Sequence, residues 1–269
     1  MKETQNKPLI DVRGLSVHFG SVSNPVRAVD GVDFQIFPGE IVALVGESGS
    51  GKSISALSLA KLVPEPAARI VGGSVKFQAV EVLELKSSEL RKLRGARIAY
   101  IFQEPATSLN PVFTVGWQIG EALRLHRKGI NVKEETGKLL ADVGLPDPAR
   151  AAEAYPHELS GGMQQRAMIA MALACNPDLL VADEPTTALD VTVQKQILDL
   201  LVELRKTRGL SILLITHNLG IVANVADRVY VMNSGKIVES GETKTVLRTP
   251  QHDYTKKLLK AVPRLHMKK

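Results

Sequence analysis

The residues with the clearest chemical potential form a glycine-rich loop in the first fifth of the chain. The loop fits the pattern G-x-x-x-x-G-K-[ST] and lies between an apolar run at 41–45 and a helical pattern at 54–60. Its members are Gly46, Glu47, Ser48, Gly49, Ser50, Gly51, Lys52 and Ser53. In that context backbone N–H groups cradle phosphate oxygens, while Lys52 adds a charge for the β- and γ-phosphates and Ser53 can hold Mg²⁺. The pattern predicts a nucleotide phosphate site, and an ordinary glycine-rich turn is the alternative.

A pair of carboxylates follows a second apolar run. Residues 179–182 are apolar, and Asp183 and Glu184 come directly after them. An ATPase with a phosphate loop needs carboxylates at the carboxyl edge of a neighbouring strand. We therefore expect Asp183 to help hold Mg²⁺ and Glu184 to act as the general base on the attacking water. In a chain without a phosphate loop, the same pair would be the solvated start of a loop.

A second candidate anion site precedes another helical pattern, at 161–174. Ser160 is placed to cap this helix, and Gly161 and Gly162 leave its first N–H groups uncovered. Because the chain already has one phosphate loop, a second element of this kind indicates a sandwich. We expect the Ser160 element of one copy to close on the nucleotide of another.

The composition limits the class of protein. The chain has 269 residues, of which 44% are hydrophobic and 23% charged, as in ordinary globular domains. We expect no membrane helix and no signal peptide, and the single cysteine, Cys175, favours a cytoplasmic protein with this residue in its core. The net charge of +6 arises after Asp253, where basic residues follow without an acid: Lys256, Lys257, Lys260, Arg264, Lys268 and Lys269. We expect this tail to be solvated rather than bound to lipid, and the low aromatic content of 4% predicts no nucleic-acid partner.

The order of hydrophobic patterns predicts an α/β fold. Residues 9–19 and 29–36 alternate as half-buried strands do, which indicates an antiparallel side sheet. Buried runs at 41–45, 98–102, 179–182 and 212–215 alternate with helical patterns, which predicts a mostly parallel sheet. Between 114 and 174 only helical patterns occur, at 116–127, 133–143, 149–155 and 161–174. We expect an ATPase core at 1–113 and 175–250, an inserted all-helical lobe at 114–174, and a short basic tail at 251–269.

The motifs together resemble those of ATP-binding-cassette (ABC) ATPases, with residues 159–166 similar to the family signature. The resemblance implies a single nucleotide-binding domain of the ABC phosphate-loop fold, with ATP and Mg²⁺ as ligands. Gln103 matches the glutamine loop, which implies a catalytic role and contact with Mg²⁺; residues 188–190 match the D-loop, which places Asp190 near ATP. His217 matches the switch histidine that senses the γ-phosphate. Phe19 matches the aromatic residue that stacks on adenine, although it could instead pack on the side sheet.

Further stretches resemble the oligopeptide, dipeptide and nickel importer subfamily. They are residues 102–111, 155–158, 185–194 and 250–263, although Asp253 stands where proline is common. The resemblance implies a second ATPase chain, identical or different, two membrane-spanning permease subunits and, indirectly, an extracytoplasmic substrate-binding protein. It places the chain peripherally on the cytoplasmic face of the inner membrane. Longer members continue into a cysteine-bearing C-terminal extension that this sequence lacks. We therefore expect the iron–sulfur cluster of those members to be absent here. Di- or oligopeptides are the expected cargo; the alternatives are nickel or a metal chelate and, in another class, a soluble non-transport ABC ATPase.

Overall fold

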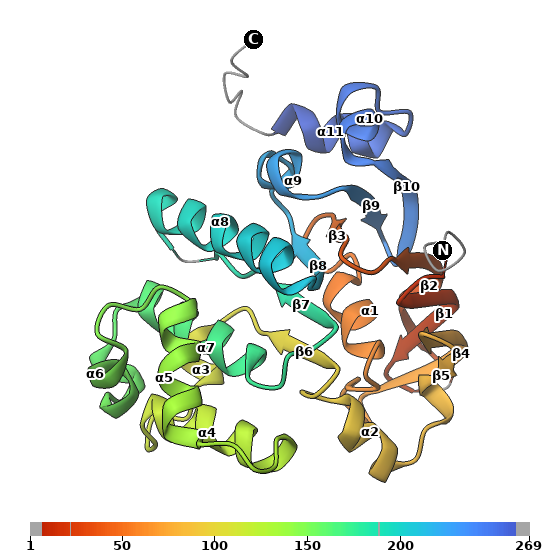
Figure 1. Cartoon of the computed structure of the whole chain (residues 1–269). Helices are drawn as coiled ribbons and strands as arrows, with labels where there is room; N and C mark the ends of the chain where they lie inside the picture. Colours follow the sequence, from red (N-terminus) through yellow and green to blue (C-terminus); the bar gives the residue numbers. More distant parts are fainter. Residues whose placement is uncertain (1–6, 22, 188, 262–269) are drawn as a thin grey trace, which may run out of the picture. The chain divides into compact units, whose positions relative to one another are not determined.

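The computed structural model describes residues 7–21, 23–187 and 189–261. The chain divides into two compact units: the first comprises Met1–Leu90 with Ser211–Lys269, and the second Arg91–Leu210. Ala188 of the expected D-loop and the basic residues Arg264, Lys268 and Lys269 lie outside the described residues. Figure 1 labels the elements, which are described below unit by unit.

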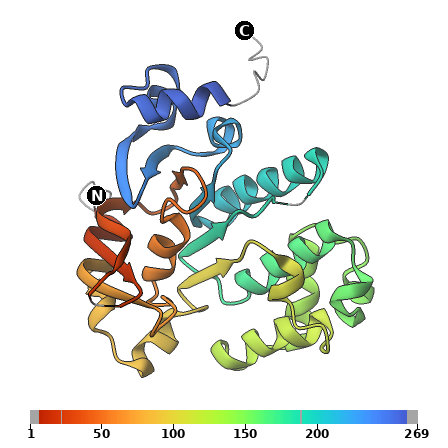
Figure 2. The same ribbon diagram turned by 180° about the vertical axis from the view of Figure 1, so that it is seen from behind.

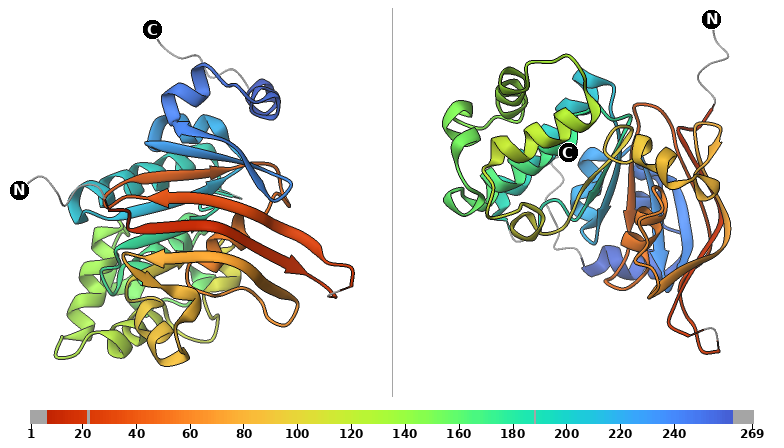
Figure 3. Two further views of the ribbon diagram at one scale, coloured as in Figure 1. Left: turned by 90° about the vertical axis from the view of Figure 1, so that its right-hand side faces the viewer. Right: turned by 90° about the horizontal axis from the view of Figure 1, so that it is seen from below.

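The first unit contains the expected antiparallel side sheet, in the order β2-β1-β4-β5. Its strands are β1 (Ile10–Phe19), β2 (Val26–Ile36), β4 (Ala68–Phe77) and β5 (Val80–Glu81), and the left view of Figure 3 shows the long ones in red and orange. Alternation along β1 buries Ile10 and Val12 and then Leu15 and Val17, and a register shift between Val12 and Leu15 interrupts the predicted pattern. Strand β4 was not among the expected strands, since its centre carries Gly72 and Gly73 and the alternation is lost there.

A second sheet places the glycine-rich loop. Within the first unit its order is β10-β9-β3-β8, from β3 (Ile41–Val45), β8 (Ser211–Thr216), β9 (Arg228–Asn233) and β10 (Lys236–Glu242). β3 pairs in parallel with both β8 and β9, and every residue of β3 and β8 is buried. Burial on both faces explains why these strands have continuous apolar sequences. A tight hairpin turn joins β9 and β10, with left-handed backbone at Ser234 and Gly235.

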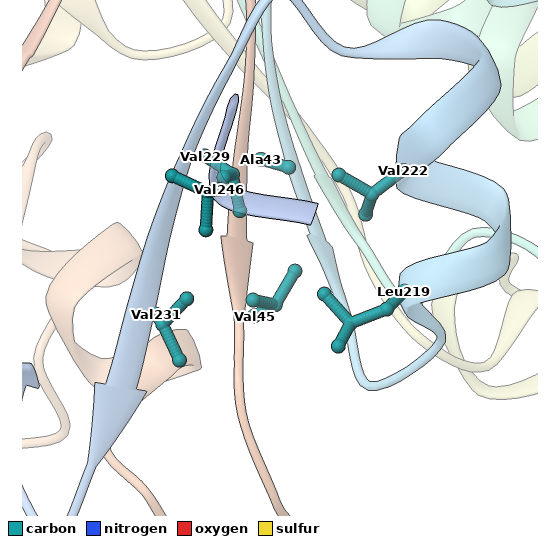
Figure 4. Packing of buried hydrophobic residues seen from close by; sticks show 7 residues of the cluster. All are labelled: Ala43, Val45, Leu219, Val222, Val229, Val231 and Val246. Carbon is teal, nitrogen blue, oxygen red and sulfur yellow. The ribbon is translucent and has the colours of Figure 1, made fainter. Parts of the chain in front are cut away.

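Helices cover this part of the sheet and complete its core. They are α1 (Lys52–Ser58), α9 (Leu219–Val225), α10 (Thr243–Arg248) and α11 (Asp253–Ala261). The short η2 (Val82–Glu84) lies against β4 of the side sheet, and α2 (Ser87–Leu93) spans the boundary between the two units. A buried cluster joins Ala43 and Val45 of β3 to residues of β9, α9 and α10, as Figure 4 shows. Its other members are Leu219, Val222, Val229, Val231 and Val246. Figure 2 shows the late helices in blue beside β9 and β10.

The second unit combines a parallel strand pair with six helices among its described residues. Strand β6 (Ile98–Ile101) pairs with β7 (Leu179–Asp183). The helices are α3 (Pro105–Ser108), α4 (Val115–His126), α5 (Val132–Asp142), α6 (Pro148–Glu153), α7 (Gly161–Leu173) and α8 (Val191–Arg208), with η3 (Pro156–Glu158) before α7. The four helices expected between 114 and 174 are confirmed with ends shifted by one or two residues (Figure 3, right, green). The narrower boundaries of the helical lobe stay a prediction.

Two remaining sequence expectations concern the cysteine and the membrane. Cys175 is half-buried just beyond α7, and burial raises the pKa of its thiol. Within the described residues, none of the helices combines the length and apolar character that crossing a bilayer requires.

Candidate functional site

The glycine-rich loop connects β3 to α1, and its first and sixth residues can only be glycine. Gly46 has φ +157° and Gly51 has φ +101°. A Cβ atom on Gly46 would lie 2.1 Å from the carbonyl oxygen of Met232, and one on Gly51 would lie 2.2 Å from that of Ala28. Both distances are far below van der Waals contact. The turn is therefore wrapped against backbone, and its shape depends on the two glycines of the motif.

Lys52 and Ser53 lie in the first turn of α1 with different exposure. The Lys52 side chain is buried, and its Nζ donates hydrogen bonds of 2.9 Å to the carbonyl oxygens of Gly46 and Glu47. Ser53 is exposed, as are Glu47, Ser48 and Gly49 along the outer side of the loop. The loop thus holds a cation from within while its outer residues face solvent. Such a cradle fits a polyphosphate group.

His217 and Phe19 belong to the same unit as the loop. β3 and β8 pair in parallel with Val45 opposite Thr216, so the loop and His217 follow the same rung of the sheet. The His217 side chain is exposed at this carboxyl edge, where α/β sheets build their sites. Phe19 is half-buried at the end of β1 and lies opposite Val26 of β2, the strand whose Ala28 contacts the loop.

In the second unit the carboxylates and Gln103 follow neighbouring strands. β6 and β7 are parallel with Ile101 opposite Ala182, so Gln103 and Glu184 each lie two residues beyond a shared rung. Glu184 has left-handed backbone, with φ +49°, which is uncommon for a residue with a side chain. The Thr187 hydroxyl donates a 3.1 Å hydrogen bond to Glu184 Oε2. Asp183 and Glu184 are partly exposed at the end of β7.

The Ser160 element and Asp190 also lie together in the second unit. Ser160 caps α7 by accepting a 3.4 Å hydrogen bond from the Met163 N–H group, and Asp190 caps α8 by accepting one of 2.9 Å from that of Val193. The side chain of Val193 lies so close to Gly162 that a Cβ there would be 2.8 Å from it. The starts of the two helices are thus adjacent, and Ser160, Gly161 and Asp190 have exposed surface.

Two side chains near these positions were not expected from the sequence. The Tyr254 hydroxyl accepts a 3.0 Å hydrogen bond from the Glu47 N–H group, and Thr187 holds the Glu184 carboxylate. Tyr254 is 207 positions away from Glu47 and no local pattern connects them. Thr187 lies only three residues after Glu184. This short spacing was the signal from which the sequence could have predicted a hydrogen bond between the hydroxyl and the carboxylate.

Comparison with known proteins identifies the family. The model of the ABC transporter family matches residues 29–187, and that of the oligopeptide/dipeptide transporter C-terminal region matches residues 238–269. The chain belongs to the ABC transporter ATP-binding family. The expected α/β fold of the ABC type is therefore confirmed, and the chain is an ABC ATPase.

Individual relatives agree with this assignment. The dipeptide transport ATP-binding protein DppD of Haemophilus influenzae is 52% identical over 95% of this chain and 78% of that protein. The peptidoglycan transport ATP-binding protein YejF of Agrobacterium fabrum is 55% identical over 98% of this chain, which spans 49% of that protein. Among solved structures, a dimeric post-hydrolysis state of the ATP-binding cassette MJ0796 bound to ADP and Pi has a TM-score of 0.77. Its sequence identity is 27%, with 87% of this chain and 98% of that chain covered.

Proposed function

We propose that this ABC ATPase energises an importer of di- or oligopeptides. The observation that carries the proposal is the presence, in one chain, of the ABC transporter domain and an oligopeptide/dipeptide transporter C-terminal region. The similarity to a DppD protein along 95% of the chain supports the same cargo class. Neither a nickel importer nor a soluble non-transport ATPase gains support from these relatives.

In the proposed mechanism the residues of the first unit bind the nucleotide. The phosphate loop, from Gly46 to Ser53, holds the phosphates. Lys52 stays hydrogen-bonded to the carbonyl oxygens of Gly46 and Glu47 and directs its ammonium charge to the phosphate oxygens. Phe19 stacks on the adenine ring. His217, which follows the same rung of the sheet as the loop, senses the γ-phosphate.

The residues of the second unit supply the reaction and the closure. Glu184 takes a proton from the attacking water, with Thr187 orienting its carboxylate. Gln103 reports on the γ-phosphate site and leads into the segment toward the permease. Ser160, Gly161, Gly162 and Asp190 act on the nucleotide of a second ATPase chain, so each site is completed by two copies.

The donor set suits Mg²⁺ as the metal of this site. Among the described residues no group of three or more His, Cys, Asp or Glu side chains is placed to hold a metal ion. Mg²⁺ prefers oxygen ligands and is bound through few protein side chains, together with waters and substrate phosphates. The Ser53 hydroxyl, the Asp183 carboxylate and the Gln103 amide are the oxygen donors that we assign to it. When bound, Mg²⁺ neutralises developing charge on the phosphate oxygens.

The proposed partners are a second ATPase chain, two transmembrane permease subunits and, indirectly, an extracytoplasmic substrate-binding protein. The chain would then lie peripherally on the cytoplasmic face of the inner membrane. Exposed apolar side chains support a docking role for the segment from Gln103 to Trp117. Val112 is 69% and Trp117 42% exposed, and the rings of Phe113 and Trp117 stack with their centroids 4.0 Å apart. Mutation of the segment is expected to reduce association with the permease.

Growth of a deletion strain tests the cargo. Loss of the gene should abolish growth on a required dipeptide and confer resistance to a toxic peptide analogue, and the intact gene should restore both. Intact peptide uptake with reduced nickel-dependent enzyme activity would instead assign a nickel importer. Intact dipeptide uptake with lost peptidoglycan transport would assign the cargo named for the YejF relative.

A further inference from the structure

One peptide group of the phosphate loop is held from both sides. The carbonyl oxygen of Gly46 accepts a 2.9 Å hydrogen bond from Lys52 Nζ, and the N–H group of Glu47 donates a 3.0 Å hydrogen bond to the Tyr254 hydroxyl. This carbonyl and this N–H belong to the same planar peptide unit. Lys52 and Tyr254 therefore fix a single rigid group from opposite edges, and the two hydrogen bonds polarise each other.

This peptide group follows a glycine, which restricts its rotation less than another residue would. Gly46 has no Cβ and adopts φ +157°, so the backbone at this position has access to conformations that other residues avoid. If the peptide turned, its carbonyl would leave Lys52, and the ammonium would lose its hydrogen bond to Gly46. The Tyr254 hydroxyl thus limits how far Lys52 can move.

Tyr254 is itself well anchored on α11. Its ring and the side chains of Leu258 and Leu259 pack on the buried cluster that includes Val45, the residue just before the phosphate loop. The Glu239 carboxylate accepts hydrogen bonds of 2.8 and 3.1 Å from the N–H groups of Gln251 and His252, which precede α11. Burial raises the pKa of Tyr254 above its ordinary value, so the hydroxyl is neutral at physiological pH.

We propose that Tyr254 is a positioning residue for ATP: its hydroxyl holds the Gly46–Glu47 peptide and thereby keeps Lys52 aligned for the phosphates. The inference rests on the phosphate-loop assignment proposed above. It gives the C-terminal region, which matches the oligopeptide/dipeptide transporter model, a role in nucleotide binding.

The test compares two tyrosine-to-phenylalanine variants of the full-length protein. Tyr254→Phe removes the hydroxyl that the phosphate loop uses. Tyr230→Phe is the matched control, because the Tyr230 hydroxyl also accepts a backbone hydrogen bond, of 3.1 Å from the Gln35 N–H group, and bonds to Gln35 and Arg228, which lie outside the loop. ATP affinity is measured by equilibrium dialysis with radiolabelled ATP, steady-state kinetics give KM and kcat, and thermal unfolding reports stability.

We expect Tyr254→Phe to raise the Kd and KM for ATP roughly 2- to 10-fold, the effect of one neutral hydrogen bond, and to change kcat less than KM. Tyr230→Phe should lower the unfolding temperature while leaving the ATP affinity unchanged. The proposal is overturned if Tyr254→Phe binds ATP like the wild type, or if both variants weaken ATP binding equally.

A double-mutant cycle shows whether the hydrogen bond itself is responsible. Glu47→Pro removes the N–H group that donates the hydrogen bond to the Tyr254 hydroxyl. Tyr254→Phe should therefore have no further effect on ATP affinity in that background. A full additional loss would show that the hydroxyl acts through another contact and would overturn the proposal. If Glu47→Pro does not fold, the comparison of the two phenylalanine variants decides alone. Failure of the phosphate-loop assignment is separate, because Lys52→Ala would then bind ATP like the wild type.

Discussion

The local geometry of Glu184 fits a side chain that must be held still. Its φ of +49° costs free energy, and the nearby Thr187 hydroxyl fixes one carboxylate oxygen. A strained backbone with an oriented side chain is common at catalytic positions, because the surrounding structure determines both. The geometry thus supports the role of general base proposed for this residue.

The general base is tested by Glu184→Gln. The amide keeps the size of the carboxylate but cannot accept a proton, so we expect hydrolysis to fall by about 10²- to 10⁴-fold. ATP binding should persist, and ATP-bound dimers should accumulate because closure no longer ends in cleavage. Phosphate release and size-exclusion chromatography measure the two effects, and wild-type turnover in this variant would exclude the assignment.

The requirement for glycine at the start of the loop gives a second prediction. Gly46→Ala would place a Cβ atom 2.1 Å from the Met232 carbonyl oxygen, so the loop must shift and ATP binding should be lost. Gly137 in α5 is the matched control, since a Cβ there meets no atom within 4 Å and its φ is not in the left-handed region. We expect Gly137→Ala to stabilise the protein by up to about 1 kcal/mol and to leave ATP binding unchanged. Thermal unfolding and ATP dialysis of both variants check this pair, and normal ATP binding by Gly46→Ala would show that the loop tolerates a side chain at its first position.

The site residues that the sequence predicted are those whose signals are local. The phosphate loop is a continuous motif between a buried strand and a helix, and the Asp183–Glu184 pair ends a buried strand. Tyr254 gave no such signal, because its partner is brought close only by the packing of α11 on the core. Hydrogen bonds between distant segments require the fold itself before they can be found.

At the level of elements, the hydrophobic pattern predicted strands in which each face keeps one environment, buried or exposed, along most of its length. β3 was predicted with its observed bounds because it is buried on both faces, and α7 because a capping serine begins it. β4 was missed because its middle residues are exposed and include two glycines, so neither period dominates. The ends of α4, α5 and α6 differed by one or two residues, where capping side chains rather than the hydrophobic pattern decide the boundary.

The attachment of α11 gives a prediction that depends on pH. Burial raises the pKa of Glu239, but favourable contacts, among them the hydrogen bonds from the N–H groups of Gln251 and His252, outweigh it, so the net pKa is lowered. A lowered folded-state pKa means that the stabilisation is present above the unfolded pKa, about 4.3, and is lost as the pH falls through the folded value. Glu239→Ala should therefore reduce the free energy of unfolding by about 1 kcal/mol at pH 7, and by less in acid.

Urea unfolding at pH 7 and in acid measures this difference. Glu242→Ala is the control on the same strand, because Glu242 is exposed and makes no side-chain hydrogen bond to the helix that it precedes. A loss of stability for Glu239→Ala that does not change with pH would show that the carboxylate charge has no part in holding α11.

At the scale of the whole molecule, each compact unit carries part of the proposed machinery. The phosphate loop, Phe19 and His217 belong to the first unit, and Gln103, Glu184 and the Ser160 element belong to the second. The sequence could predict this inventory and the family, because each motif is contiguous. It could not name the cargo, because the proposed contacts of this chain are with ATP and the permease rather than with the solute.

Mixing two inactive variants tests whether the Ser160 element acts on another copy. In Lys52→Ala the phosphates lose their cation, whereas Ser160→Arg puts a bulky side chain at the exposed start of α7. If the element acts in trans, a mixed dimer has one site with both defects and one site with neither. With random pairing of equal amounts, half of the dimers are mixed, and one of the two sites in each mixed dimer is intact. About a quarter of all sites should then be active. ATPase assays of the mixture and of each variant alone measure the recovery; if mixed dimers form but remain as inactive as either parent, each chain must complete its own site.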